Sequence, residues 1–128
     1  MKKKILIVSS IVFLVLGAQC SSPKTMEEST QKQQVKQISI KEQMAKGGFL
    51  VDVRTREEFE TGSVKGAVNI PLYEIENRID EFKGKPYVIL FCRSGHRAGI
   101  AKSLLESKGI SNITNGINAD TINAELSK

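Results

Sequence analysis

Apolar residues in this chain fall into short runs whose spacing changes along the sequence. A mostly apolar run over residues 5–17, interrupted by Ser9 and Ser10, stands near the start and is followed by a polar stretch that reaches about Gln37. Two shorter runs, 49–53, which includes the single charged residue Asp52, and 87–91, are bounded by glycine, proline and charged residues. Short continuous runs of this kind are typical of strands that are buried on both faces of a parallel sheet.

Helical spacing appears between and after these runs. Ala98, Ala101 and Leu104 share one face of a predicted helix that ends near Gly109. The alternation of strands and helices predicts a small open α/β sheet with helices on both faces. The other predicted elements are an edge strand over 35–40, a helix over 41–46, a glycine-punctuated loop and short strand over 62–71, an amphipathic helix over 73–82 and a last strand over 113–115.

The most informative stretch is the polar hexapeptide Cys-Arg-Ser-Gly-His-Arg at residues 92–97, between a buried strand and a helix. Ser94 and Gly95 let the backbone curl, so that successive N–H groups point toward the Cys92 sulfur. A nest of N–H groups with a helix N-terminus behind it stabilises an anion. We therefore predict that Cys92 has a lowered pKa and acts as a thiolate nucleophile.

The charged members of this loop have separate expected roles. Arg93 and Arg97 are candidates for attracting an anionic substrate and stabilising a departing anion. Arg97 has an alternative role, in which it braces the loop against Asp52. His96 is expected at the solvent rim rather than as a general base. A purely structural buried Cys92 is the other interpretation, but a core position would not need a polar loop after it.

Charged residues also follow the strand over 49–53, where open α/β sheets place their sites. Thr55 and Glu58 have the spacing of a capping box for a helix through residue 60. We expect Arg54 to pair with Glu58, and Asp52 to accept hydrogen bonds from the Cys92 loop. Asp52, Arg54 and Glu58 are therefore predicted to support the loop rather than to contact the substrate.

The N-terminal part predicts export. Three lysines precede the apolar run, and residues 1–20 are interpreted as a signal peptide because a run of thirteen residues is too short to span a membrane. Residues 16–20 resemble a bacterial lipobox, which makes Cys20 the candidate lipidated residue, although ordinary cleavage after Ala18 or Cys20 is an alternative. Residues 21–37 are predicted to be a flexible polar linker and residues 38–128 the folded domain. We expect a protein of the bacterial periplasm or cell envelope, held to the membrane by lipid.

Charge and cysteine content narrow the possible functions. Lys2, Lys3 and Lys4 leave with the signal peptide, which takes the formal net charge from +5 to +2 and removes any argument for nucleic-acid binding. Two distant cysteines and one histidine make no zinc-ligand set, and there is no Cys-x-x-Cys motif for dithiol redox chemistry. No metal and no cofactor are expected.

The loop resembles the active-site loop of the rhodanese sulfurtransferases, and the resemblance covers residues 38–115. It implies that Cys92 carries a persulfide between a small-molecule sulfur donor, such as thiosulfate, and an acceptor such as cyanide or a thiol. We expect the protein to be a monomer. This chain departs from the family at Ser63, where histidine is usual, and in its tail after Gly116. The motifs that carry the resemblance are residues 92–97, Leu50-Val-Asp52-Val-Arg54, Glu57-Glu58-Phe59, Gly62 and Gly66-Ala67-Val68-Asn69-Ile70-Pro71.

Two other functions remain open from the sequence. Cysteine-dependent phosphatases and arsenate reductases also use a loop from cysteine to arginine at a helix N-terminus. In the phosphatases the arginine stands six positions after the cysteine, whereas Cys92 and Arg97 are five positions apart. A catalytically silent rhodanese-like binding module is the second alternative, although the retained Cys92 argues against it.

Overall fold

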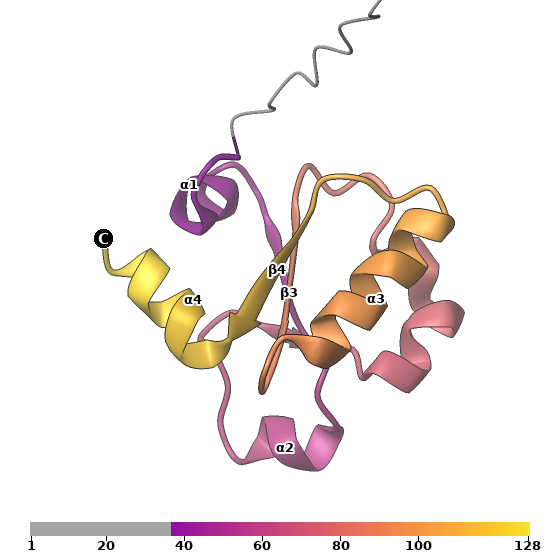
Figure 1. Ribbon diagram of the computed structural model, residues 1–128, viewed down its shortest axis with the longest axis horizontal. Helices are drawn as coiled ribbons and strands as arrows, with labels where there is room; N and C mark the ends of the chain where they lie inside the picture. Colours follow the sequence, from indigo (N-terminus) through magenta and orange to yellow (C-terminus); the bar gives the residue numbers. More distant parts are fainter. Residues whose placement is uncertain (1–36) are drawn as a thin grey trace, which may run out of the picture. The chain divides into compact units, whose positions relative to one another are not determined.

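The computed structural model describes residues 37–128, and the predictions for the signal peptide, for Cys20 and for most of the linker lie outside these residues. The described chain forms a four-stranded parallel sheet in the order β2-β1-β3-β4 (Figure 1). The predicted open parallel α/β sheet is confirmed. Its elements are α1 Ile40–Ala45, β1 Phe49–Asp52, α2 Arg56–Glu60, β2 Val68–Asn69, the 3₁₀ helix η1 Leu72–Glu81, β3 Val88–Cys92, α3 His96–Ser107, β4 Ile113–Asn118 and α4 Ala119–Leu126.

Both faces of the sheet are covered, as the apolar runs predicted. All five residues of the central strand β3 are buried, and their side chains alternate between two hydrophobic clusters. Val88 and Leu90 pack in the cluster that includes residues of η1 and α3, whereas Ile89 and Phe91 pack with residues of α1 and α4. Figure 1 shows α3 on one side of the sheet and α1 and α4 on the other.

The predicted edge strand over 35–40 is wrong for the part that the structure describes. Residues 37–39 belong to no strand, and Ile40 begins α1. Ser39 is the helix N-cap, because its hydroxyl accepts a hydrogen bond from the Glu42 N–H at 3.2 Å. The buried Gln43 side chain donates to the Ile38 carbonyl at 2.8 Å, which ties the segment before the helix to α1 instead of to a strand.

The amphipathic helix predicted over 73–82 is present but irregular. It is a 3₁₀ helix, and Arg78 interrupts it with φ −123° and ψ 23°. Ile75 and Phe82 are buried from this segment, as the spacing predicted. The residue at the kink is also held by its side chain. The Arg78 guanidinium donates to the Asn69 carbonyl at 3.3 Å and pairs with Glu74 and Glu81.

The C-terminal helix α4 was not predicted. Asn118 caps it by accepting the Thr121 N–H at 2.8 Å, and Ile122 is fully buried against the sheet. Position 116 in β4 requires glycine, because a Cβ there would stand 2.2 Å from the Ile122 side chain. The tail is therefore part of the folded domain, next to the end of β4.

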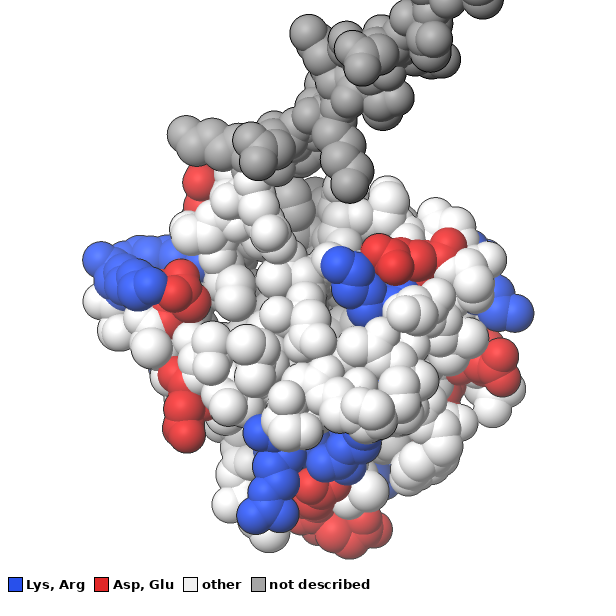
Figure 2. Space-filling model, viewed as in Figure 1, with Lys and Arg blue, Asp and Glu red and all other residues white. Residues whose placement is uncertain are grey.

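Charged side chains of both signs are interspersed on the face drawn in Figure 2, including the region around α2. Several form surface ion pairs, such as Lys46 with Glu42 and Arg56 with Glu74. Among residues 37–128, no helix is both long and apolar enough to cross a membrane.

Candidate active site: the Cys92 loop

Cys92 is the last residue of the central strand β3 and is only 3% exposed. It packs in the hydrophobic cluster that includes Val53 and Ala98. The pairing of β3 with β4 is irregular here, so that Cys92 lies opposite Asn118 and the adjoining residues of β4 bulge past the loop. The sequence placed this thiol correctly at the carboxyl edge of the central strand.

Backbone N–H groups surround the sulfur. The Gly95 N–H donates to Cys92 Sγ at 3.1 Å, and Gly95 has φ 84°, a left-handed conformation that glycine adopts without strain. Burial raises the pKa of the Cys92 thiol, but the N–H groups lower it more, so the pKa lies below its ordinary value. These N–H groups belong to Ala98, Ser94, Gly95 and Arg97.

Arg97 is braced by a carboxylate from a distant part of the chain. Its two terminal nitrogens donate to the two carboxylate oxygens of Glu58, at 2.6 and 2.9 Å. The hydrogen bonds from Arg97, helped by the Thr55 N–H, lower the pKa of Glu58 to about 2. The predicted capping box is confirmed, because Thr55 and Glu58 also exchange their hydrogen bonds at the start of α2.

Two predicted pairings are wrong. Arg54 pairs with Asp52 rather than with Glu58, and Arg97 pairs with Glu58 rather than with Asp52. The fully buried Asp52 carboxylate accepts from the Arg54 backbone and guanidinium and from the Ser63 hydroxyl at 2.8 Å. These donors occupy Asp52, so it supports the ends of β1 and of the loop around Ser63, with no hydrogen bond to the Cys92 loop.

The outer side of the loop faces solvent. Arg93, Ser94 and His96 are exposed, whereas Gly95 is buried. His96 therefore lies at the rim, as predicted. Within residues 37–128, Arg93 forms no ion pair, which leaves its charge available to an anionic ligand.

Sequence reasoning missed one side chain that touches the loop. Asn115 of β4 donates through Nδ2 to the Gly95 carbonyl at 2.9 Å. No motif marks this residue, and twenty positions separate it from Gly95. Asn115 lies opposite Leu90, two residues before Cys92, where the parallel pairing of β3 with β4 brings it to the loop.

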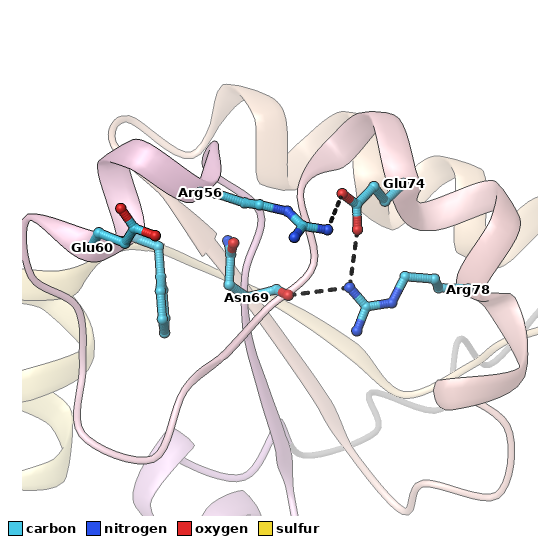
Figure 3. Close-up of a pocket in the computed structure, with 6 residues that line it drawn as sticks. Arg56, Glu60, Asn69, Glu74 and Arg78 are labelled. Carbon is cyan, nitrogen blue, oxygen red and sulfur yellow. Dashed lines mark hydrogen bonds and ion pairs between the residues drawn. The ribbon is translucent and has the colours of Figure 1, made fainter.

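Two cavities lie near the site's supporting elements. One of about 230 Å³ is lined by Val53, Thr55, Leu72, Tyr73 and Pro71 and reaches the loop through Arg97. A larger one of about 570 Å³ lies between α2 and η1, away from the thiol. Figure 3 shows Arg56 and Arg78 reaching the Glu74 carboxylate in the larger cavity. Arg78 also pairs with Glu81, so both guanidinium groups already have carboxylate partners and we assign no site there. In the described part of the chain, no group of His, Cys, Asp and Glu side chains is arranged to hold a metal ion.

The Rhodanese-like domain family model matches residues 31–121. The chain belongs to this family. The matched residues include the Cys92 loop and Asn115.

Among curated relatives, the thiosulfate sulfurtransferase PspE of Escherichia coli is 34% identical over 67 residues, 51% of this chain and 64% of PspE. The uncharacterized protein YqhL of Bacillus subtilis is 39% identical over 66 residues, 52% of each chain. The match thus spans less than two thirds of the length of either relative.

Solved structures show the same fold. A rhodanese from E. coli superposes with a TM-score of 0.54 at 30% identity, covering 58% of this chain and 89% of the other. A rhodanese-like domain protein from Staphylococcus aureus gives a TM-score of 0.52 at 27% identity, covering 61% and 72% of the two chains. Sulfur transfer is the activity named for PspE and for several other relatives, among them a tRNA sulfurtransferase of Thermoplasma acidophilum.

Proposed function

We propose that this protein is a sulfurtransferase that moves sulfane sulfur from thiosulfate, or a similar donor, to cyanide or a thiol through a persulfide on Cys92. The observation that carries the proposal is the 3.1 Å hydrogen bond from the Gly95 N–H to Cys92 Sγ in a loop of N–H groups. This arrangement favours a thiolate, and a thiolate is the form of cysteine that attacks a sulfur–sulfur bond.

The first step is attack of the Cys92 thiolate on the outer sulfur of thiosulfate. A new S–S bond forms at Sγ while the S–S bond of thiosulfate breaks, and its electron pair leaves with sulfite. The persulfide that results is again an anion at its terminal sulfur. The same N–H groups that lower the pKa of the thiol are suited to stabilise that anion.

The second step returns the enzyme to its starting state. A nucleophilic acceptor attacks the terminal sulfur, the S–S bond of the persulfide breaks, and its electron pair restores the Cys92 thiolate. With cyanide as the acceptor the product is thiocyanate. No metal, redox cofactor or external oxidant enters the balance of either step.

The two arginines divide the work. Arg93 is exposed and has no ion pair among residues 37–128, so it attracts the anionic donor to the loop. Arg97 is held by Glu58, and the hydrogen bonds to that carboxylate raise the pKa of Arg97. Arg97 therefore keeps the loop in shape and adds positive charge beside the thiol. Of the two roles expected for Arg97, the contact with Glu58 favours the brace.

The test is thiocyanate formation by the full-length protein with thiosulfate and cyanide. We expect turnover that depends on both substrates and disappears in Cys92→Ser. Lys108→Ala, which replaces an exposed residue at the far end of α3, serves as the control and should retain turnover. Absence of turnover with thiosulfate and with other sulfane donors would contradict the proposal.

A further inference from the structure

We propose that Asn115 is a positioning residue for the chemistry of Cys92, because its side-chain amide fixes the Gly95 residue that hydrogen-bonds the sulfur. The inference rests on the proposed function in so far as it concerns the same nucleophile. It adds a residue from β4 to a site that the sequence assigned only to the loop and to the segment after β1.

The carboxamide of Asn115 bridges two backbone groups. Its Nδ2 donates to the Gly95 carbonyl at 2.9 Å, and its Oδ1 accepts the Ile117 N–H at 3.0 Å. Exchanging the oxygen and nitrogen would place two donors together and two acceptors together, so the contacts fix the orientation of the amide. The side chain therefore clamps the loop to the end of β4.

The clamp acts on the residue that touches the thiol. The Gly95 N–H donates to Cys92 Sγ at 3.1 Å, and the Gly95 carbonyl accepts from Asn115 and from the Gly99 N–H at 2.8 Å. The carbonyl and the N–H of one residue are linked through only two dihedral angles. Holding the carbonyl in place therefore restricts the direction in which the N–H points.

The backbone beside the clamp is strained. Ile117 is exposed and has φ 69°, a left-handed conformation that is unfavourable for a β-branched residue. A Cβ at Gly95 would stand 3.4 Å from Ile117 Cα, so this segment packs closely on the loop. Such strain persists only where surrounding contacts impose it, and the hydrogen bond from Ile117 N–H to Asn115 is one of them.

Charged groups near the thiol are unchanged when Asn115 is replaced. The loop contributes Arg93, His96 and Arg97. Glu58 comes from α2, and Asp52 with its partner Arg54 comes from the end of β1. Asn115 itself is uncharged. A shift of the thiol midpoint in an uncharged variant of Asn115 would thus report the direction of the N–H groups and not a change in local charge.

The experiment measures the alkylation rate of Cys92 against pH in full-length Asn115→Ala, in a Cys20→Ala background that leaves Cys92 as the only thiol. We expect the midpoint to rise by about one unit, which corresponds to about tenfold less thiolate below the midpoint. We expect kcat for sulfur transfer to fall several-fold with the KM for thiosulfate nearly unchanged.

The matched control is Asn118→Ala. It removes a second asparagine of β4 whose side chain caps α4 and forms no hydrogen bond with the loop, so it should lower stability and leave the thiol midpoint in place. A folded Asn115→Ala protein with the midpoint of its parent would overturn the inference. So would an equal shift in Asn118→Ala, because that would indicate general loosening.

A measurement on the unsubstituted side chain covers the case in which Asn115→Ala does not fold. In an NMR titration, the Gly95 N–H and the Asn115 side-chain amide should shift with the midpoint of the Cys92 thiol. An Asn115 amide that does not respond would overturn the inference. If the parent protein shows no sulfur transfer but the pH midpoint of the Cys92 thiol still rises in Asn115→Ala, the positioning role stands and the proposed function is rejected.

Discussion

Arg97 of the Cys92 loop and Glu58 of α2 form a bidentate ion pair, with N–O distances of 2.6 and 2.9 Å, although 39 positions separate them in the chain. Each side chain is 31% exposed. The pair ties the segment after β1 to the loop after β3. It therefore links the two parts of the sheet edge that the functional site needs.

Replacing Glu58 with glutamine tests this brace. Glutamine still suits a capping box, so Glu58→Gln removes the charge and leaves the start of α2 capped. Allowing for solvent screening, we expect a loss of about 1–2 kcal/mol in the free energy of unfolding at pH 7. Urea unfolding measures this loss. Glu57→Gln, which removes a neighbouring exposed carboxylate without an ion pair among residues 37–128, should cost much less.

The cost of Glu58→Gln should also depend on pH. The folded-state pKa of Glu58 is lowered to about 2 from 4.5, so its stabilisation is fully present above 4.5 and is lost as the pH falls through about 2. The difference in stability between Glu58→Gln and the parent should therefore shrink to less than half by about pH 3. A difference that stays constant from pH 7 to pH 3 would show that the ion pair is not its source.

Arg93 should act on binding of the donor rather than on the thiol. We expect Arg93→Ala to raise the KM for thiosulfate a few-fold, about what a solvent-exposed charge contributes, and to leave the pH midpoint of the thiol in place. The effect should diminish at high ionic strength. Lys108→Ala removes an exposed charge at the other end of α3 and should leave the KM unchanged. If both substitutions raise the KM equally, Arg93 acts only through the net charge of the protein and not through its position in the loop.

Loop length separates sulfur transfer from phosphate chemistry. Because Arg97 stands five positions after Cys92, the N–H groups close around one sulfur. We therefore expect the parent protein to show negligible hydrolysis of aryl phosphates and negligible reduction of arsenate. Inserting one glycine after Gly95 should widen the loop, break the contact with Asn115 and lower sulfur transfer by at least about tenfold. Strong phosphatase activity that is lost in Cys92→Ser would favour the alternative function.

Local patterns predicted the elements that hold the site. The apolar runs located β1 and β3, and the hexapeptide after β3 located the thiol, because strand burial and loop chemistry depend on neighbouring residues. The Thr55–Glu58 capping box was predicted for the same reason.

Partners that are distant in sequence were not predictable in this way. Spacing gives no information on which of two nearby carboxylates Arg97 meets, and the choice between Asp52 and Glu58 depends on Arg54 occupying Asp52. Asn115 reaches Gly95 because the pairing of β3 with β4 places it opposite Leu90, next to the loop, and sequence spacing does not give that register. The sequence of the tail contains a weak indication of α4, because Asn118 is a suitable N-cap residue and Ile122 and Leu126 follow it at helical spacing.

The predicted lipid anchor is a separate proposal and concerns Cys20. If the residues before it are removed and its thiol is acylated, Cys20→Ala should move the protein from the membrane fraction to the soluble fraction. Fractionation followed by detection of the protein measures this. A parent protein that is already soluble, or a variant that stays with the membrane, would reject the lipobox interpretation.

The most direct test of the central claim is the intact mass of the protein after treatment with thiosulfate. We predict the addition of one sulfur atom, removed by cyanide with release of thiocyanate and absent in Cys92→Ser. The Cys20→Ala variant should gain the same mass, which places the added sulfur on Cys92. An unchanged mass of the folded protein under these conditions, or an added sulfur that persists in Cys92→Ser, would contradict a persulfide mechanism at Cys92.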